Sequence, residues 1–251
     1  MDTALFVALS HQSAMRRQMD VVANNIANMN TTAFKKESVM FQEYIQELDN
    51  GELGTSQISY VLDFGVARDF TEGAHTYTSN PMDVAITGPG FIEVTGDDGE
   101  NKYTRNGHLM LDPEGFVMTS TGQRVHDAAG GEIQLQPGDN ILTIMENGLI
   151  ITENAEEPLG PLSLYEFDNP QALKKLGDNL YETTAEPKTY GQDEVKQSKF
   201  LQFMLEGSNV NSIEEVTRMI HISRSYQSVA KMLSESKDMR KEAINQLGRT
   251  G

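Results

Sequence analysis

The sequence predicts an α+β protein in which long N- and C-terminal helices pair as a coiled-coil domain around an inserted, antiparallel all-β body. Near both ends of the 251-residue chain, apolar residues recur at alternating intervals of three and four. Between Gly99 and Gly148, turn-forming glycines recur at intervals of roughly eight residues. The two ends are almost neutral, whereas the middle of the chain is strongly acidic.

The first helix is expected between Leu5 and Met29. Its apolar positions follow the spacing of a coiled-coil seam, with a skipped position at Gln12: Leu5, Ala8, Met15, Met19, Val22, Ile26 and Met29. Polar residues that compete for backbone hydrogen bonds follow at once and should end the helix: Asn28, Asn30, Thr31 and Thr32. Residues 1–34 are therefore assigned to the N-terminal part of a discontinuous helical domain.

The central region divides into two parts. Residues 35–80 are polar and weakly patterned, and they are expected to form an extended linker or a small β-element. Residues 81–200 are assigned to an acidic all-β body, because runs rich in β-forming residues alternate with turn signals. A sandwich or barrel is the expected arrangement. The predicted strands are residues 83–86, 91–94, 102–105, 108–111, 116–119, 124–126, 133–135, 141–144, 149–151 and 162–167.

Helix signals return after the strands. A short helix is expected at residues 169–177, where Asn169 can cap, Pro170 suits the first helical position and Gly177 suits the stop. Residues 201–251 are assigned to the C-terminal part of the helical domain. Its helix should begin near Ser212 and reach about Leu247, a length of ~50 Å. The seam spacing recurs there at Met219, Ile222, Tyr226, Val229 and Leu233.

Charge and composition exclude several classes of protein. The net charge is −17, and residues 41–200 hold 9 basic against 28 acidic side chains. A nucleic-acid partner is not expected, because no basic stripe with interleaved aromatic residues exists. The chain has no cysteine, which excludes disulfides and thiolate zinc sites. The apolar run at residues 4–9 is too short to span a bilayer, and Asp2 stands where a signal peptide is basic, so neither membrane insertion nor a cleaved signal peptide is expected.

No pattern in the sequence predicts catalysis, a metal site or a cofactor. The five histidines form no pair with metal-ligand spacing. The glycines around Pro89 lead into a predicted strand and not into a helix, so they do not predict a phosphate loop. One alternative stays open. With so many acids in the body, a pair of carboxylates of the glycosidase type remains possible by counting alone.

Several sequence blocks, taken together, are similar to those of a known family. The first is Val22-Ala23-Asn24-Asn25-Ile26-Ala27-Asn28, which continues through Thr31, Thr32, Phe34 and Lys35. The others are Asn80-Pro81-Met82-Asp83-Val84-Ala85-Ile86, Tyr103-Thr104-Arg105-Asn106-Gly107, and Ser208-Asn209-Val210 followed by Met219-Ile220, Arg224 and Tyr226. In this order they resemble the flagellar rod and hook family of axial proteins.

Finer features resemble the proximal rod protein of that family more than its distal rod or hook proteins. They are the compact length, the strand that leads into Asp168-Asn169-Pro170, and Leu176-Gly177-Asp178-Asn179-Leu180-Tyr181. Two departures stand out. Ala33 occupies a position where the family usually has glycine, and residues 200–204 replace a more polar, glycine-containing approach to the C-terminal block.

The resemblance implies a non-enzymatic, structural subunit of the proximal flagellar rod, without cofactors, that polymerises through its terminal helices into the drive shaft transmitting motor torque. It implies as partners further copies of the chain, neighbouring rod proteins and the type III flagellar export apparatus, and a location in the basal body within the periplasmic space. A neighbouring rod or hook subunit is one alternative. A carbohydrate-binding or carbohydrate-acting β-domain with oligomerising helices is the other.

The predicted subunit interface takes residues from both ends of the chain. It consists of Leu5, Leu9, Met15, Met19, Val22, Asn24, Asn25, Ile26, Asn28, Phe34, Asn209, Val210, Val216, Met219, Ile220, Ile222, Arg224, Tyr226, Val229 and Leu233.

Overall fold

The computed structural model describes residues 2–49, 55–136, 139–153, 158–188 and 197–248 and has an α+β fold. The chain forms two compact units. We call the first the helical unit; it contains Met1–Ala27, Glu37–Asp69 and Asn211–Gly251. We call the second the β-rich unit; it contains Asn28–Lys36 and Phe70–Val210. Each unit is described separately.

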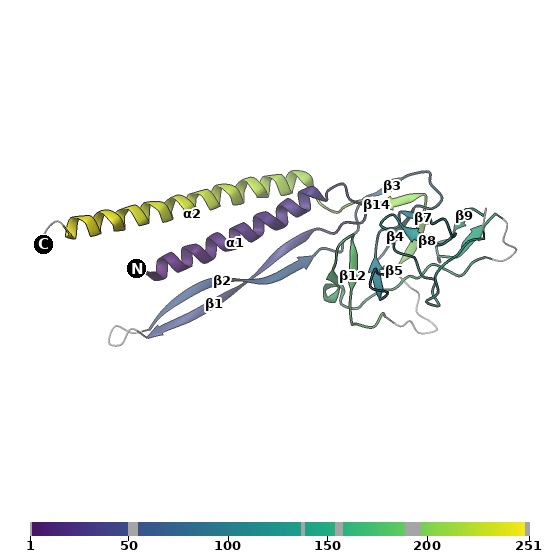
Figure 1. The fold of residues 1–251 in the computed structure, drawn as a ribbon, viewed down its shortest axis with the longest axis horizontal. Coiled ribbons are helices and arrows are strands. Elements are labelled where there is room, and N and C mark those ends of the chain that lie inside the picture. The colour runs from purple at the N-terminus through teal and green to yellow at the C-terminus, as the bar shows by residue number, and fades with distance from the viewer. Residues whose placement is uncertain (1, 50–54, 137–138, 154–157, 189–196, 249–251) are drawn as a thin grey trace. The chain divides into compact units, whose positions relative to one another are not determined.

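The helical unit contains two long helices that lie side by side and run in opposite directions, α1 (Asp2–Ala27) and α2 (Ser212–Leu247) (Figure 1). Helix α2 has the bounds predicted from the sequence. Its N-cap is Asn211, whose side chain accepts hydrogen bonds from the backbone N–H groups of Ile213 and Glu214. Helix α1 ends two residues before the predicted Met29.

The two helices meet along the predicted seam. Met15, Val22 and Ile222 are buried together, and further seam residues pack partly buried against them: Met19, Ile26, Met219, Tyr226 and Val229. The side-by-side contact follows from the apolar spacing of both helices. Coiled-coil pairing, which requires knobs-into-holes geometry along this contact, stays a prediction.

A long antiparallel hairpin completes the helical unit. Strands β1 (Glu37–Asp49) and β2 (Thr55–Arg68) pair from Glu37 opposite Arg68 to Asp49 opposite Thr55. An isolated two-stranded hairpin is marginally stable in water, and both strands of this one contact α1. Figure 1 shows the hairpin beside α1. Arg17 of α1 and Asp63 of β2 also form an ion pair at 3.0 Å. The hairpin is larger than the linker or small β-element expected for residues 35–80.

All strand pairs of the β-rich unit are antiparallel among the described residues. A four-stranded sheet has the order β11-β12-β6-β5, and the other strands form the pairs β13-β4, β14-β3, β7-β8 and β10-β9. The strands are β3 (His75–Tyr77), β4 (Val84–Thr87), β5 (Ile92–Thr95), β6 (Asn101–Thr104), β7 (Leu109–Leu111), β8 (Val117–Thr119), β9 (Ile141–Ile144), β10 (Ile150–Thr152), β11 (Lys174–Lys175), β12 (Leu180–Glu182), β13 (Lys199–Gln202) and β14 (Met204–Glu206).

The core of the β-rich unit has an aliphatic and an aromatic part. The aliphatic part gathers buried side chains from strands throughout the unit, among them Val84, Ile92 and Phe200. In the aromatic part, Phe91 contacts neighbouring rings edge-on, with centroid distances of 5.7 Å to Tyr181 and 5.9 Å to Phe167. Since β13 and β14 pair with β4 and β3, the core is complete only when residues 199–206 are in place.

Two groups of secondary-structure predictions need correction. The predicted strands at 124–126, 133–135 and 162–167 are seen only as isolated bridges, because each meets its partner over single residue pairs and forms no ladder. The predicted helix at 169–177 was wrong. Only one 3₁₀ turn, η2 (Pro170–Ala172), follows the Asn169 cap. Pairing of β11 with β12 and the burial of Leu173 in the aromatic core take the following residues out of the helix.

Candidate assembly surface and the buried groups that support it

The predicted interface residues fall into five groups in the structure. Eight of them form the contact between α1 and α2 within one chain: Met15, Met19, Val22, Ile26, Met219, Ile222, Tyr226 and Val229. These side chains shape the helical unit and leave little surface for a neighbouring subunit. The sequence predicted that the terminal helices pair and also assigned these residues to the subunit interface; the structure uses them for the pairing within the chain.

A second group faces outward from the helices. Leu9 is 45% exposed on α1, and Val216 and Ile220 are 45% and 46% exposed on α2. Ile213, which was not among the predicted residues, is 78% exposed. At 3.6 residues per turn, Ile213, Val216 and Ile220 lie on one side of α2, turned well away from Ile222. We call these three residues the outer stripe. Asn24 and Arg224 are exposed as well.

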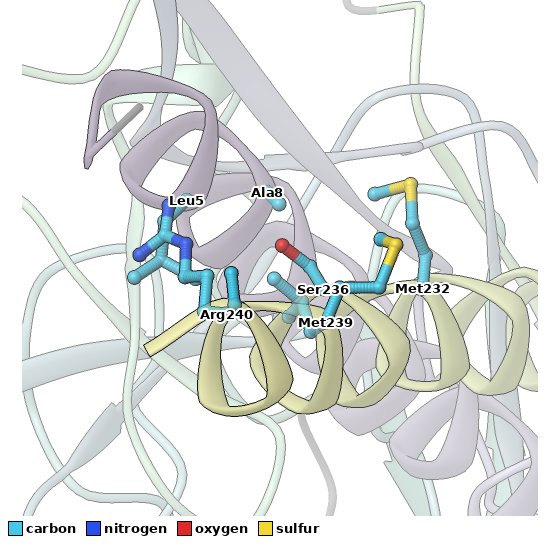
Figure 2. A pocket seen from close by; sticks show the side chains of 8 residues that line it. Leu5, Ala8, Met232, Ser236, Met239 and Arg240 are labelled. Atoms are coloured by element: carbon cyan, nitrogen blue, oxygen red, sulfur yellow. The ribbon is translucent and has the colours of Figure 1, made fainter. Parts of the chain in front are cut away.

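Leu5 and Leu233 line an apolar groove between the start of α1 and the second half of α2 (Figure 2). The groove has a volume of about 510 Å³, and its lining is Leu5, Ala8, Met232, Leu233, Ser236, Met239, Arg240 and Ala243. Met232 and Met239 are 54% and 65% exposed, so α2 presents flexible thioether side chains here. The periodic spacing had identified three of these lining residues, Leu5, Ala8 and Leu233.

Asn25 connects three elements of the helical unit. Its side chain is fully buried. The amide nitrogen donates to the Glu37 carbonyl oxygen at 2.8 Å and to Glu215 Oε2 at 3.1 Å, and the amide oxygen accepts from the Glu37 N–H at 3.0 Å. One side chain thus joins α1 to the start of β1 and to the first turn of α2. Asn25 was predicted at the subunit surface, but the structure places it inside the chain.

The remaining predicted residues belong to the β-rich unit, in the segments near its ends. Phe34 is buried, and Lys175 Nζ lies 4.1 Å from the centroid of its ring. Asn209 Oδ1 accepts from the Lys36 N–H at 2.7 Å, and Asn209 Nδ2 donates to the Thr71 carbonyl oxygen at 3.1 Å. Asn28 Oδ1 accepts from Thr31 Oγ1 at 3.2 Å, and Val210 is half-buried. Phe34 and Asn209 organise the chain locally.

A buried charge cluster in the same unit was missed by the sequence analysis. Lys35, Arg105 and Glu206 have side chains that are 0%, 1% and 0% exposed. Lys35 Nζ donates to Glu206 Oε1 at 2.6 Å, and Arg105 Nε donates to Glu206 Oε2 at 2.9 Å. Lys35 and Arg105 are members of the sequence blocks quoted above. No local signal marks Glu206 as their partner, because 171 and 101 residues separate it from them.

Burial and pairing act in opposite directions on this cluster. Burial alone favours the neutral form of Glu206, but the charges of Arg105 and Lys35 outweigh it and hold the pKa of this carboxyl below its usual value. Burial, with repulsion from Arg105, lowers the pKa of Lys35. The carboxylate of Glu206 is therefore held ionised by its two basic partners, whereas the burial of Lys35 carries a cost in desolvation.

Ala33 and Phe203 lie in the two segments where the sequence differs from the family pattern, and both have backbone angles that favour glycine. Ala33 has φ of 57° and Phe203 has φ of 63°. Ala33 is 1% exposed, and its N–H donates to the Glu206 carbonyl oxygen at 2.8 Å. The chain thus keeps a left-handed turn at Ala33 although the side chain there disfavours it.

We expect Ala33→Gly to change the free energy of unfolding by less than about 1 kcal/mol. Relief of left-handed strain stabilises the variant by about 1 kcal/mol, and loss of a buried methyl group and added freedom of the unfolded chain offset it. Chemical denaturation of both proteins measures the difference. A loss of several kcal/mol would show that the methyl group of Ala33 is essential to the turn.

The buried acids of the β-rich unit belong to separate hydrogen-bonded groups. Glu93 accepts from Tyr103 Oη at 3.2 Å and lies 3.3 Å from His126 Nδ1, and burial together with Glu93 raises the pKa of Tyr103. Asp83 lies 2.7 Å from His108 Nδ1. Within the described ranges no group of three or more His, Asp or Glu side chains could hold a metal ion. Neither helix, as far as the structure describes it, is long and apolar enough to cross a membrane.

Three family descriptions match consecutive parts of the chain. "Flagella basal body rod protein" matches residues 5–35, "Flagellar hook protein FlgE/F/G D1 domain" matches residues 85–152, and "Flagellar basal body rod FlgEFG protein C-terminal" matches residues 201–247. The first match covers most of α1, and the last covers the end of β13, all of β14 and α2.

Full-length relatives carry the same names. The chain is 39% identical to the flagellar basal-body rod protein FlgF of Caulobacter vibrioides over 99% of both chains, and 31% identical to FlgF of Mesorhizobium japonicum over the same share of each. It is 29% identical to the flagellar basal-body rod protein FlgG of Caulobacter vibrioides, over 97% of this chain and 98% of the relative. With this identity over its whole length, the chain belongs to the family of flagellar basal-body rod proteins.

Proposed function

We propose that this protein is a structural subunit of the bacterial flagellar rod, that it belongs to the proximal rod, and that its terminal helices pair as a coiled coil and polymerise into the shaft that carries motor torque. The observation that carries the proposal is the apolar surface that α1 and α2 leave exposed. It includes Phe6, Leu9, the outer stripe, Met232, Met239 and Ile244, with exposures from 45% to 78%. Large apolar side chains left exposed at several positions along both helices indicate surfaces for a protein partner.

The helices of neighbouring subunits are the occupants that fit this surface. The outer stripe and the groove lie on different sides of α2, so one helix can contact more than one neighbour. The ends of the chain are almost neutral, so copies do not repel one another there, while the acidic middle keeps the free subunit soluble. Burial of apolar area contributes about 25 cal/mol per Å² to such an assembly.

Two alternatives are weighed against this proposal. A neighbouring rod position within the family is the nearer one; the FlgF relative at 39% identity, against 29% for FlgG of the same organism, favours the FlgF-like position. The carbohydrate-acting alternative needs paired acids in one cleft. Glu93, Asp83 and Glu206 are instead engaged in separate polar groups, and the family is structural and not enzymatic.

Further parts of the proposal concern the route and place of assembly. Export through the type III flagellar apparatus without a cleaved leader, and a position in the periplasmic space with other rod proteins as partners, are supported by membership of the rod family. In the proposed division of the chain, residues 1–34 and 201–251 contain the axial helices, and residues 81–200 form the acidic β-body. No nucleic-acid partner and no membrane insertion are proposed.

Charging the outer stripe tests the proposed function. We expect Ile220→Glu to abolish swimming and rod completion when it replaces the natural protein in cells. In isolation the variant should unfold within about 0.5 kcal/mol of the unchanged protein, since Ile220 is exposed. Soft-agar motility and electron microscopy of purified basal bodies supply the first readout, and chemical denaturation supplies the second.

Ser228→Glu is the matched control, because Ser228 is exposed on the same helix about 80° around from Ile220. It adds the same charge outside the outer stripe and should leave swimming intact. Charging Met19, Val22 and Ile26 would be a weaker test, because those side chains pack within the chain. Normal swimming with Ile220→Glu would contradict the proposal.

A further inference from the structure

Four points along the chain pass between the helical unit and the β-rich unit, and three segments of the β-rich unit carry them. Residues 28–36 carry two, since this segment is preceded and followed by the helical unit. The segment that begins at Phe70 and the segment that ends at Val210 carry one each. Any force that travels along the backbone between the units passes through these three segments.

The buried charge cluster connects all three segments. Lys35 of the first segment donates to the Thr71 carbonyl oxygen of the second at 2.7 Å and to Glu206 Oε1 of the third. The N–H of Gly73 donates to the same Oε1 at 3.0 Å. Glu206 is therefore the acceptor that the first two segments share.

Arg105 fixes this carboxylate to the interior of the unit. Its Nη1 donates to the carbonyl oxygens of Gly88 and Gly90, both at 2.8 Å, and its Nη2 donates to the Ile86 carbonyl oxygen at 3.1 Å. The guanidinium thus uses three of its groups on backbone carbonyls and Nε on Glu206. The three crossing segments are anchored through one carboxylate to the strand β4 and the turn after it.

Backbone contacts draw the same segments together. The N–H groups of Ala33, Gly207 and Asn209 donate to the carbonyl oxygens of Glu206, Ala74 and Phe34. Between the second and third segments there is no room for a side chain, because a Cβ on Gly73 would lie 2.0 Å from the Gly207 carbonyl oxygen. A buried ion pair is weak evidence for added stability, and in some proteins it fixes geometry instead, which matches a cluster whose lysine is costly to bury.

We infer that Lys35, Arg105 and Glu206 form a clasp that makes the three crossing segments open and close as one unit. A load that reaches any one segment is then shared by all three. The load-bearing role rests on the proposed function, whereas the coupling of the segments stands on the contacts alone. In the clasp, Lys35 and Arg105, which come from two distant sequence blocks, both bind the carboxylate of Glu206.

Hydrogen exchange on the purified full-length protein tests the coupling. We expect Glu206→Gln to speed exchange at least tenfold in peptides covering residues 31–36, 70–77 and 203–210 together, while strand β5 (Ile92–Thr95) keeps its protection. Glu146→Gln is the control, since the Glu146–Lys199 ion pair is exposed at both partners. A change confined to residues 203–210, or one spread evenly over the β-rich unit, overturns the clasp.

Lys35→Met covers the case in which Glu206→Gln does not fold, because it leaves the Arg105–Glu206 pair intact. It should speed exchange in all three segments as well. If exchange becomes faster only in residues 31–36, the coupling is overturned. In cells, this variant should swim more slowly than the unchanged strain in viscous medium at equal protein levels. Equal speed, with coupled exchange still seen, overturns the load-bearing role alone; Ile220→Glu tests the proposed function separately.

Discussion

Replacing Arg105 by leucine is expected to destabilise the β-rich unit by about 3–5 kcal/mol, the typical cost of removing one partner of a buried ion pair. Arg105 is 1% exposed and donates to three backbone carbonyls and to Glu206. Leucine fills part of the volume but donates no hydrogen bond. The carbonyls of Ile86, Gly88 and Gly90 then lose their buried donor, and Glu206 keeps only Lys35 and the Gly73 N–H among these partners.

Chemical denaturation followed with two optical probes shows whether this loss of stability occurs in the β-rich unit. The chain has no tryptophan, and Tyr103, Tyr165 and Tyr181 of the aromatic core contribute to its near-ultraviolet circular dichroism. The signal at 222 nm reports mainly α1 and α2. We expect the near-ultraviolet transition to move to lower denaturant concentration and the helical transition to move much less.

Arg124→Leu is the matched control for Arg105→Leu. Arg124 pairs with Asp112, Glu114 and Glu132, but its side chain is 34% exposed and these pairs are screened by water. Its replacement should cost much less than that of Arg105. Equal losses for the two variants would mean that burial of the Arg105 hydrogen bonds contributes little.

The same cluster predicts how acid affects the β-rich unit. Because the pKa of Glu206 is lower in the folded chain, its contribution to stability is fully present above the ordinary pKa of a glutamate. This contribution is lost as the pH falls through the lowered folded value. Glu206→Gln should therefore remove part of the acid dependence of unfolding, as measured by denaturation midpoints over a pH series. An unchanged acid dependence in this variant would contradict the assignment.

The helices could be predicted well from the sequence because their signals are local. The cap at Asn211, the acids in the first turn and the apolar spacing all lie within a few residues of one another, and α2 has the predicted bounds. The helix expected at 169–177 had similar end signals but was wrong. Leu173 is buried in the aromatic core, and Lys174 and Lys175 pair with β12, contacts that no local pattern contains.

The helix seam and the buried charge cluster also differ in how far the sequence could predict them. Apolar spacing identified Val22 and Ile222 as seam residues. Which helix each seam packs against depends on the tertiary structure, and in the structure the seams of α1 and α2 pack against each other. Lys35, Arg105 and Glu206 come from segments far apart in the chain, so their pairing required the fold.

Asn25→Asp is expected to destabilise the helical unit by about 3–5 kcal/mol at neutral pH. The change replaces the amide nitrogen by an oxygen at a fully buried position. Two donated hydrogen bonds, to the Glu37 carbonyl oxygen and to Glu215 Oε2, are lost together. In their place, a new carboxylate faces the carboxylate of Glu215, which is itself 0% exposed. Repulsion and burial both act against the charged form.

The loss should shrink as the pH falls. Burial and the Glu215 charge raise the folded pKa of the carboxyl introduced by Asn25→Asp, so the folded state binds the proton more tightly than the unfolded state. The deficit is then largest at neutral pH and smaller at about pH 5, where the introduced carboxyl binds a proton more readily in the folded state. Asn25→Leu, which we expect to cost about 2–4 kcal/mol through unpaired groups, adds no titrating group. Its deficit should vary less with pH than that of Asn25→Asp, and denaturation at both pH values, followed at 222 nm, compares the two variants. Parallel deficits at the two pH values would show that Glu215 does not face the side chain at position 25.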